Sequence, residues 1–323
     1  MDILHQLTLE ESLFALSEHA FCWLNQGTCT PAIVMGSYND PHTLLNLTQI
    51  AKDGIPVIKR YTGGGTVYVD NNTYLMSFIL NGIPSPAPTQ HVQVQHHDKK
   101  TTVGPREIMA WSHEFLHPIF SDALQLPSFE VRDHMDYVIG IGDTQENALK
   151  IGGNAQKISR SRFVHHTSFL WDYDVRAMQH YLLVPELRKQ PSYRRNRTHA
   201  DFVVALKRHC NAGMTMQDLD DLFAHRVVEY FENVMGLTVQ HVSMELVRDQ
   251  LEHEFKKQYD AKQIEHTQRR VAKLESKGAK VSENDRRVRT SADVHLRTAV
   301  INEQLFGTAQ PTQRTTFTQN NIS

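Results

Sequence analysis

The chain has 323 residues, of which 40% are hydrophobic, so it is long enough to bury a core and is expected to be globular. Its formal net charge is −2 and its pI is near 6.8, which excludes a general electrostatic attraction to nucleic acid or to an anionic membrane. No apolar run approaches the length of a membrane-spanning helix. Residues 1–4 lack the basic, amphipathic character of a targeting peptide, so none is expected.

The three cysteines indicate a reducing compartment. Cys22, Cys29 and Cys210 match neither a zinc-binding spacing nor the even number of a disulfide framework.

The first predicted element is a helix that begins near Thr8. Thr8 precedes Glu11 by three residues, which is the spacing of a capping box. Leucine and alanine then recur at helical spacing as far as Leu24. We expect this helix to pack on a sheet.

Strands are predicted next. Two short apolar runs, 31–36 and 55–59, are typical of buried strands. Polar and apolar residues alternate over 66–70, and β-branched and aromatic residues resume over 74–80 after the turn residues Asn71 and Asn72. The following stretch, 84–104, is rich in Pro, Gln, His and Lys and is predicted to be a mobile surface loop within the domain.

The second half returns to helix and strand. A helix is predicted from Pro105 or Glu107 to Leu124, bent or broken at Pro118, and strands are predicted from 129 to 170. A further helix with a strong apolar face is predicted over 216–234. This order of elements predicts an α+β fold with mixed or antiparallel sheets flanked by helices.

The composition changes after about Glu245. Lysine, arginine and glutamate dominate there, which indicates a solvated helical face or a short coiled coil rather than a nucleic-acid contact. We therefore predict a catalytic domain over 1–245, a charged helical extension over 246–307 and a disordered, Gln/Thr/Asn-rich tail over 308–323.

Two glycine-containing motifs carry the chemistry. The first is Arg60-Tyr61-Thr62-Gly63-Gly64-Gly65-Thr66, and the second is Lys150-Ile151-Gly152-Gly153-Asn154-Ala155-Gln156. Glycine lets main-chain N–H groups approach a ligand closely, while arginine offers a planar fork of donors and lysine a compact charge. Together they predict an anion site suited to an acyl phosphate. The alternatives are a flexible hairpin and an ordinary exposed lysine.

Several other sites are excluded by their missing motifs. There is no P-loop, no Rossmann turn and no Gly-x-Ser-x-Gly sequence. His165 and His166 are adjacent on a predicted strand and point to opposite faces, so a structural role is favoured over a metal site.

These motifs resemble the lipoate-protein ligases, within the larger biotin/lipoate ligase fold. The similarity extends from the first helix to about Val242 and includes Asp136-Tyr137-Val138 and the run 165–170. The sequences of the motifs are most similar to those of the eukaryotic, plant-type branch. Biotin ligase itself is disfavoured because its Gly-Arg-Gly-Arg-type loop is absent.

The resemblance implies a two-step reaction. ATP and lipoate form an enzyme-bound lipoyl adenylate, and a lysine of an acceptor domain then displaces AMP. Lys150 is implied as the catalytic residue, which stabilises the charge that develops on the anhydride oxygens without being acylated. Arg60 and the glycine backbone are implied to hold the phosphate, Thr62 and Tyr68 to line the lipoyl slot, and Asp136 to contact magnesium or steer the incoming amine. The full set of implied binding residues is Arg60, Thr62, Gly63, Gly64, Gly65, Tyr68, Asp136, Ala155 and Glu10.

The resemblance also implies cofactors and partners. ATP and Mg²⁺ are the expected cofactors and lipoate the expected substrate. The expected acceptors are the E2 subunits of 2-oxoacid dehydrogenases and the glycine cleavage H protein, and no nucleic-acid or membrane partner is expected. The protein is expected to be a monomer in the mitochondrial matrix or in the cytoplasm.

Departures from the family pattern keep two alternatives open. Val69 replaces a histidine of the bacterial ligases, Thr73 an asparagine and Thr167 a glycine. The charged segment after Glu245 is unlike the usual accessory domain, so adenylation would depend on a partner or be lost. One alternative is an ATP-independent octanoyl or lipoyl transferase, although no cysteine occupies the expected place for a thioester. The other is a non-catalytic lipoyl-domain binding protein.

Overall fold

The computed structural model describes residues 1–84, 103–126, 128–133, 135–140 and 148–243, with 247, 257, 261, 264–265, 267–269, 271–273, 276 and 299–300. The predicted tail at 308–323, most of the predicted extension at 246–307 and all but the ends of the predicted loop at 84–104 lie outside these residues. Within the described part, no helix is long and apolar enough to cross a membrane.

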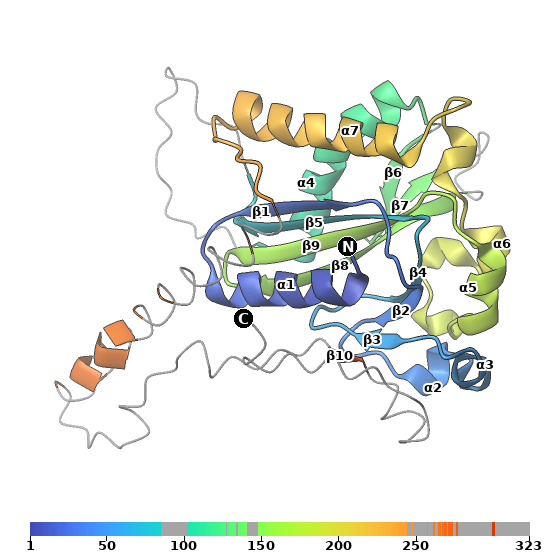
Figure 1. Ribbon diagram of the computed structural model, residues 1–323, viewed down its shortest axis with the longest axis horizontal. Helices are drawn as coiled ribbons and strands as arrows, with labels where there is room; N and C mark the ends of the chain where they lie inside the picture. Colours follow the sequence, from blue (N-terminus) through green and yellow to red (C-terminus); the bar gives the residue numbers. More distant parts are fainter. Residues whose placement is uncertain are drawn as a thin grey trace.

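Two sheets organise the domain, as Figure 1 shows. The larger is antiparallel with the order β1-β5-β9-β8-β7-β6, and the smaller has the order β10-β3-β2-β4 with β2 and β3 parallel. The larger sheet contains β1 (Phe21–Asn25), β5 (Thr73–Asn81), β6 (Glu130–Arg132), β7 (Asp136–Ile139), β8 (Leu149–Ser159) and β9 (Arg162–Leu170). The smaller contains β2 (Ala32–Met35), β3 (Val57–Lys59), β4 (Thr66–Val69) and β10 (Ala299–Val300). The predicted α+β class is confirmed.

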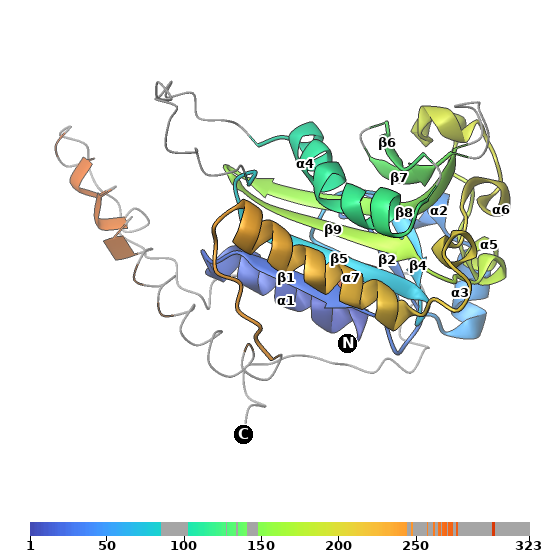
Figure 2. The same ribbon diagram turned by 90° about the horizontal axis from the view of Figure 1, so that it is seen from above.

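Helices cover both faces of the larger sheet. Figure 2 shows α4 and α7 on one face, and α1 lies on the other. The helices are α1 (Ile3–Leu16), α2 (Pro41–Leu44), α3 (Leu47–Asp53), α4 (Pro105–His117), α5 (Val175–Tyr181), α6 (His199–Phe202) and α7 (Met216–Val228). At Pro118, where a bend or break was predicted, α4 ends at His117 and the chain continues as a π-helical turn over Pro118–Ala123.

An aromatic core joins α4 and α7 to the larger sheet. Phe78 of β5 meets Trp111 and Phe115 of α4 in edge-to-face contacts at 5.2 and 5.1 Å. Phe169 of β9 contacts Phe223 of α7 at 5.6 Å. Such pairs add about 0.5–1.5 kcal/mol to the free energy of burial. The opposite face of the sheet is thereby left to form a cavity with α1 and the smaller sheet.

The predicted first helix was wrong at both ends. It begins at Ile3 with Asp2 as the N-cap, and it ends at Leu16. Phe21–Asn25 is strand β1, paired antiparallel with β5. Leu24 on the strand continues the helical spacing of the leucines in α1 only by coincidence. Pairing with the longer strand β5 stabilises the extended conformation of Phe21–Asn25. Cys22 therefore lies on β1, where burial raises the pKa of its thiol.

Candidate active site

A cavity of about 580 Å³ lies between α1, the two sheets and the segment that follows α5. One end is largely apolar, because Ile3, Leu7, Val34, Val67, Val69 and Leu75 belong to the lining and pack together in one cluster. The other end is polar, lined by Arg60, Gly64, Asp136, Lys150, Asn154 and Arg194. The cavity therefore suits a molecule with an apolar chain and an anionic head.

Lys150 and Asp136 form an ion pair at the polar end. Lys150 Nζ lies 2.8 Å from Asp136 Oδ1, and their side chains are 21% and 9% exposed. The register of β7 against β8 shifts between Tyr137 and Val138, so Ile151 has no partner on β7. This bulge directs Lys150 to the face of the sheet that carries Asp136, as bulges beside active sites often do.

The two glycines after Ile151 have different roles. A Cβ at Gly153 would lie 3.1 Å from Lys150 Nζ, so the missing side chain gives Lys150 room to reach Asp136. A Cβ at Gly152 would lie 2.8 Å from the ring of Phe169 on the core face. A side chain at Gly152 would thus conflict with the core, and one at Gly153 would crowd the ammonium group of Lys150.

We predict that Gly152→Ala destabilises the protein by about 1–3 kcal/mol, because it overpacks the core against Phe169. Urea unfolding measures the loss. The control is Gly65→Ala, since a Cβ at Gly65 would have no atom within 4 Å. Equal stabilities of the two variants would contradict the packing role of Gly152.

Arg60 supports the glycine loop from behind. Its guanidinium is buried and donates to Thr62 Oγ1 at 2.9 Å and to the carbonyls of Val34, Gly63 and Gly65 at 3.3, 2.9 and 2.8 Å. Burial lowers its pKa to about 10, although the charge of Glu10 acts in the opposite direction. In this arrangement the donors of the Arg60 fork are directed at the loop, and the implied contact of Arg60 with a phosphate stays a prediction.

The glycine loop joins the two sequence motifs. Gly63 N–H donates to the carbonyl of Gln156 on β8 at 3.2 Å, and Gly64 has a φ of +101°. A Cβ at Gly64 would lie 2.8 Å from Arg60 and 3.0 Å from both the Ala155 Cβ and the Asn154 carbonyl. Gly64, Gly65 and Ala155 line the cavity. The predicted proximity of the two motifs is confirmed.

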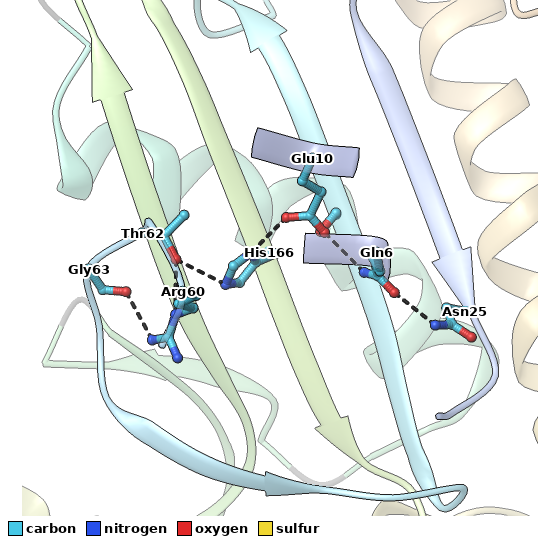
Figure 3. Close-up of polar contacts among 8 residues, drawn as sticks. Gln6, Glu10, Asn25, Arg60, Thr62, Gly63 and His166 are labelled. Carbon is cyan, nitrogen blue, oxygen red and sulfur yellow. Dashed lines mark hydrogen bonds and ion pairs between the residues drawn. The ribbon is translucent and has the colours of Figure 1, made fainter. Parts of the chain in front are cut away.

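A chain of buried polar groups runs from α1 to the glycine loop (Figure 3). Glu10 accepts hydrogen bonds from Gln6 at 3.0 Å, from Ser77 at 2.6 Å and from His166 Nδ1 at 2.9 Å. The other His166 nitrogen lies 3.4 Å from Thr62 Oγ1, which accepts from Arg60. The fully buried Glu10 thus provides the counter-charge of this chain.

Burial raises the pKa of Glu10, but the electrostatic interaction with His166 and the hydrogen bonds from His166, Ser77 and Gln6 bring it below its ordinary value of 4.5. A carboxyl group whose pKa is lowered by folding contributes stability above its unfolded-state pKa, and this contribution disappears as the pH falls through the folded-state value. We predict that Glu10→Gln lowers the unfolding free energy by about 1–3 kcal/mol near pH 7 and by less as the pH falls below about 4.5. Urea unfolding across this pH range measures the difference. A difference that stays constant with pH would contradict the prediction.

Two implied slot residues lie elsewhere. Tyr68 faces away from the cavity and stacks on Tyr181 at 5.7 Å, whereas its neighbours Val67 and Val69 line the cavity. Thr62 is fully buried behind the glycine loop. Tyr68 and Thr62 are therefore not among the residues that line this cavity, and on β4 the alternation turns Val67 and Val69 toward it instead of Tyr68. The implied place of Tyr68 and Thr62 in a lipoyl slot stays a prediction.

The departures from the family pattern have local explanations. Val69 packs with Ile3 and Leu7 in the apolar wall. Thr73 donates to Asp70 Oδ1 at 3.1 Å in the turn before β5. Thr167 donates to Asn154 Oδ1 at 2.6 Å and so orients an amide in the cavity lining.

The adjacent histidines point to opposite faces, as predicted. His166 lies beside Glu10, whereas His165 is fully buried with its Nε2 3.2 Å from the Tyr137 hydroxyl. Burial lowers the pKa of His165 to about 3. Among the residues that the structure describes, no group of three His, Cys, Asp or Glu side chains converges on a metal position.

Asp136 does not fit the predicted magnesium contact. Its Oδ1 accepts from Lys150, and its Oδ2 accepts from the Tyr193 hydroxyl at 2.9 Å. A second cation beside the Lys150 ammonium would be repelled. We therefore derive no step through magnesium.

A cationic segment that belongs to none of the sequence motifs borders the polar end. Arg194 is buried, lines the cavity and lies 4.6 Å from the centre of the Phe202 ring. Burial lowers its pKa, although it stays a cation. Lys189 lines the same end. The available signal in the sequence was the group of three arginines at positions 194, 195 and 197.

Known proteins share this fold. The chain is similar to a bipartite lipoate-protein ligase of Thermoplasma acidophilum, described with its E2 lipoyl domain, with a TM-score of 0.55 and 15% identity over 78% of this chain and 85% of that one. It is also similar to a lipoate-protein ligase A bound with ATP, with a TM-score of 0.51 and 14% identity over 79% of this chain and 87% of that one. The fold is therefore that of the lipoate-protein ligases.

Residues 2–231 match the family described as Lipoyl protein ligase A/B catalytic domain, and the chain belongs to that family. A curated relative, named Inactive lipoate–protein ligase 2 of Plasmodium falciparum, is 27% identical over 288 residues, which cover 74% of this chain and 70% of the relative. Of four further curated relatives, all named as lipoate-protein ligases, the chain spans 40–42% of the length.

Proposed function

We propose that the protein is an ATP-dependent lipoate-protein ligase. The observation that carries this proposal is the Lys150–Asp136 ion pair at the polar end of a cavity whose other end is apolar. An acyl chain fits the apolar end and a mixed anhydride the polar end. The ATP-bound ligase of the same fold supports ATP as the co-substrate.

In the first step, a lipoate carboxylate oxygen attacks the α-phosphorus of ATP, and pyrophosphate leaves. In the second, the ε-amine of an acceptor lysine attacks the acyl carbonyl, AMP leaves with the C–O bonding electrons, and the amine loses a proton. Negative charge develops on phosphate and carbonyl oxygens in both steps. The Lys150 ammonium, held by Asp136, is placed to stabilise that charge.

Partners and compartment belong to the same proposal. A protein of the same fold was studied with its E2 lipoyl domain, which supports E2 lipoyl domains as acceptors, with the glycine cleavage H protein as a second acceptor. We propose a monomer in the mitochondrial matrix, with the cytoplasm as the alternative. That the chain belongs to the eukaryotic, plant-type branch of the family stays a prediction, as does the use of Mg²⁺ together with ATP.

A second candidate is acyl transfer without adenylation. A curated relative that is named Inactive lipoate–protein ligase 2 is the reason to keep this candidate. The protein would then take a preformed lipoyl adenylate.

Lipoate-dependent exchange of labelled pyrophosphate into ATP tests the proposal, with octanoate as a parallel acid. Exchange supports the ligase. Folded protein without exchange rules out adenylation by this chain. Transfer from synthetic lipoyl adenylate to an apo lipoyl domain would then support the second candidate, and binding of that domain without transfer would support a non-catalytic binding protein.

A further inference from the structure

We propose that Tyr193 is a positioning residue that fixes Asp136 and, through it, the ammonium group of Lys150. The catalytic consequence of this inference rests on the function proposed above, whereas the structural consequence does not. Tyr193 belongs to none of the sequence motifs and reaches the site from a separate segment of the chain.

The geometry gives each oxygen of Asp136 one donor. The Tyr193 hydroxyl donates to Oδ2 at 2.9 Å, and Lys150 lies 2.8 Å from Oδ1. A carboxylate held only by a flexible lysine can rotate about its Cβ–Cγ bond. The second donor removes that freedom, and hydrogen bonds to a charged group are the strong ones. The side chain of Lys150 therefore extends across the space beside Gly153 to a carboxylate of fixed orientation, that of Asp136.

Tyr193 is itself held rigidly. It is 9% exposed, and its ring lies 5.1 Å from that of Phe202. The preceding residue, Ser192, donates from its hydroxyl to Asp133 at 2.9 Å, in the turn between β6 and β7. The hydroxyl therefore approaches Asp136 from a packed segment, not from a free loop.

The same segment also holds the β8 backbone around Lys150. Arg197 donates to the Ala148 carbonyl at 2.9 Å, and Val204 N–H donates to the Lys150 carbonyl at 2.9 Å. Arg195 and Asn196, which lie between Arg194 and Arg197, have φ values of 50° and 61°, a conformation that costs free energy for residues other than glycine. Hydrogen bonds of Ser192 before this turn and of Arg197 after it hold the strained backbone in place. This turn places Tyr193 and Arg194 at the cavity.

The charge state of the hydroxyl fits a donor. Burial and the neighbouring charge of Asp136 raise the pKa of Tyr193 far above its ordinary value. The phenol therefore keeps its proton at any physiological pH and donates it to the carboxylate.

The test compares Tyr193→Phe with Tyr173→Phe. Tyr173 is the matched control because its hydroxyl donates to the Val203 carbonyl at 3.1 Å in the adjoining segment. The first readout is acetylation of Lys150 by limiting acetic anhydride, quantified by mass spectrometry. We expect about threefold or greater labelling in Tyr193→Phe than in the control, as a loosened ion pair exposes the amine. Asp136→Asn is the reference for full loosening.

The second readout is acyl transfer from synthetic lipoyl adenylate. We expect kcat of Tyr193→Phe to fall about tenfold with KM changed less than about twofold, because a misplaced charge affects the transition state more than binding. In the Asp136→Asn background, Tyr193→Phe should have little further effect, since a residue that acts through another shows strong coupling with it. Melting temperatures identify any loss of fold.

Labelling of Lys150 equal to that of the Tyr173→Phe control would overturn the inference. Effects of Tyr193→Phe and Asp136→Asn that simply add would overturn it as well. If the wild-type protein transfers no acyl group, the proposed function fails, yet the labelling comparison still decides whether Tyr193 positions Lys150.

Discussion

Lys150→Ala is expected to lower acyl transfer by about 10²–10³-fold while leaving the protein folded, since removing one preorganised charge from a site of this kind has an effect of that size. The loss should appear with ATP and lipoate and also with synthetic lipoyl adenylate, because anionic charge develops in both steps. Single-turnover transfer to an apo lipoyl domain measures it, and far-UV circular dichroism checks the fold.

The matched control is Lys157→Ala. Lys157 lies on the same strand, β8, but outside the cavity lining, so its loss should leave transfer unchanged. A Lys150→Ala protein that transfers at the wild-type rate would show that Lys150 has no catalytic role. A protein that binds lipoyl domains equally well with and without Lys150, and never transfers, would instead be a binding protein.

Local sequence patterns predicted most of the strands. They also predicted that the triple-glycine motif and the Lys150 motif lie close together. Residues 66–70 and 74–80 alternate or carry β-branched and aromatic side chains, and the structure has β4 and β5 there. The position of the triple glycine before a strand also follows from sequence, because three glycines end one strand and free the backbone for the next turn.

The predictions failed where the structure depends on residues that are far apart in the sequence. The first helix was extended through Leu24 because helical spacing cannot reveal that Phe21–Asn25 pairs with β5. The acceptors of Arg60 could not be predicted either, because an arginine beside glycines suits an anion as well as the carbonyls of its own loop. Tyr193 was missed because its partner, Asp136, is 57 residues away in the chain.

Gly64→Ala is expected to lower acyl transfer by about 10²-fold or more, because it disturbs the glycine loop of the first motif where this loop contacts the second motif on β8. The φ of +101° would strain an alanine, and its Cβ would lie 2.8 Å from Arg60 and 3.0 Å from the Asn154 carbonyl. Relief of these contacts requires the loop to move away from β8. Acyl transfer and urea unfolding should both be measured.

Gly82→Ala separates strain from steric conflict. Gly82 has a similar φ of +107°, but a Cβ there would meet no atom within 4 Å. Both variants bear the cost of alanine at positive φ, about 1–2 kcal/mol of stability. Only Gly64→Ala should also lose transfer, because only its Cβ conflicts with Arg60 and β8. Equal loss of transfer in the two variants would mean that strain alone explains the effect, and that Arg60 does not support the loop.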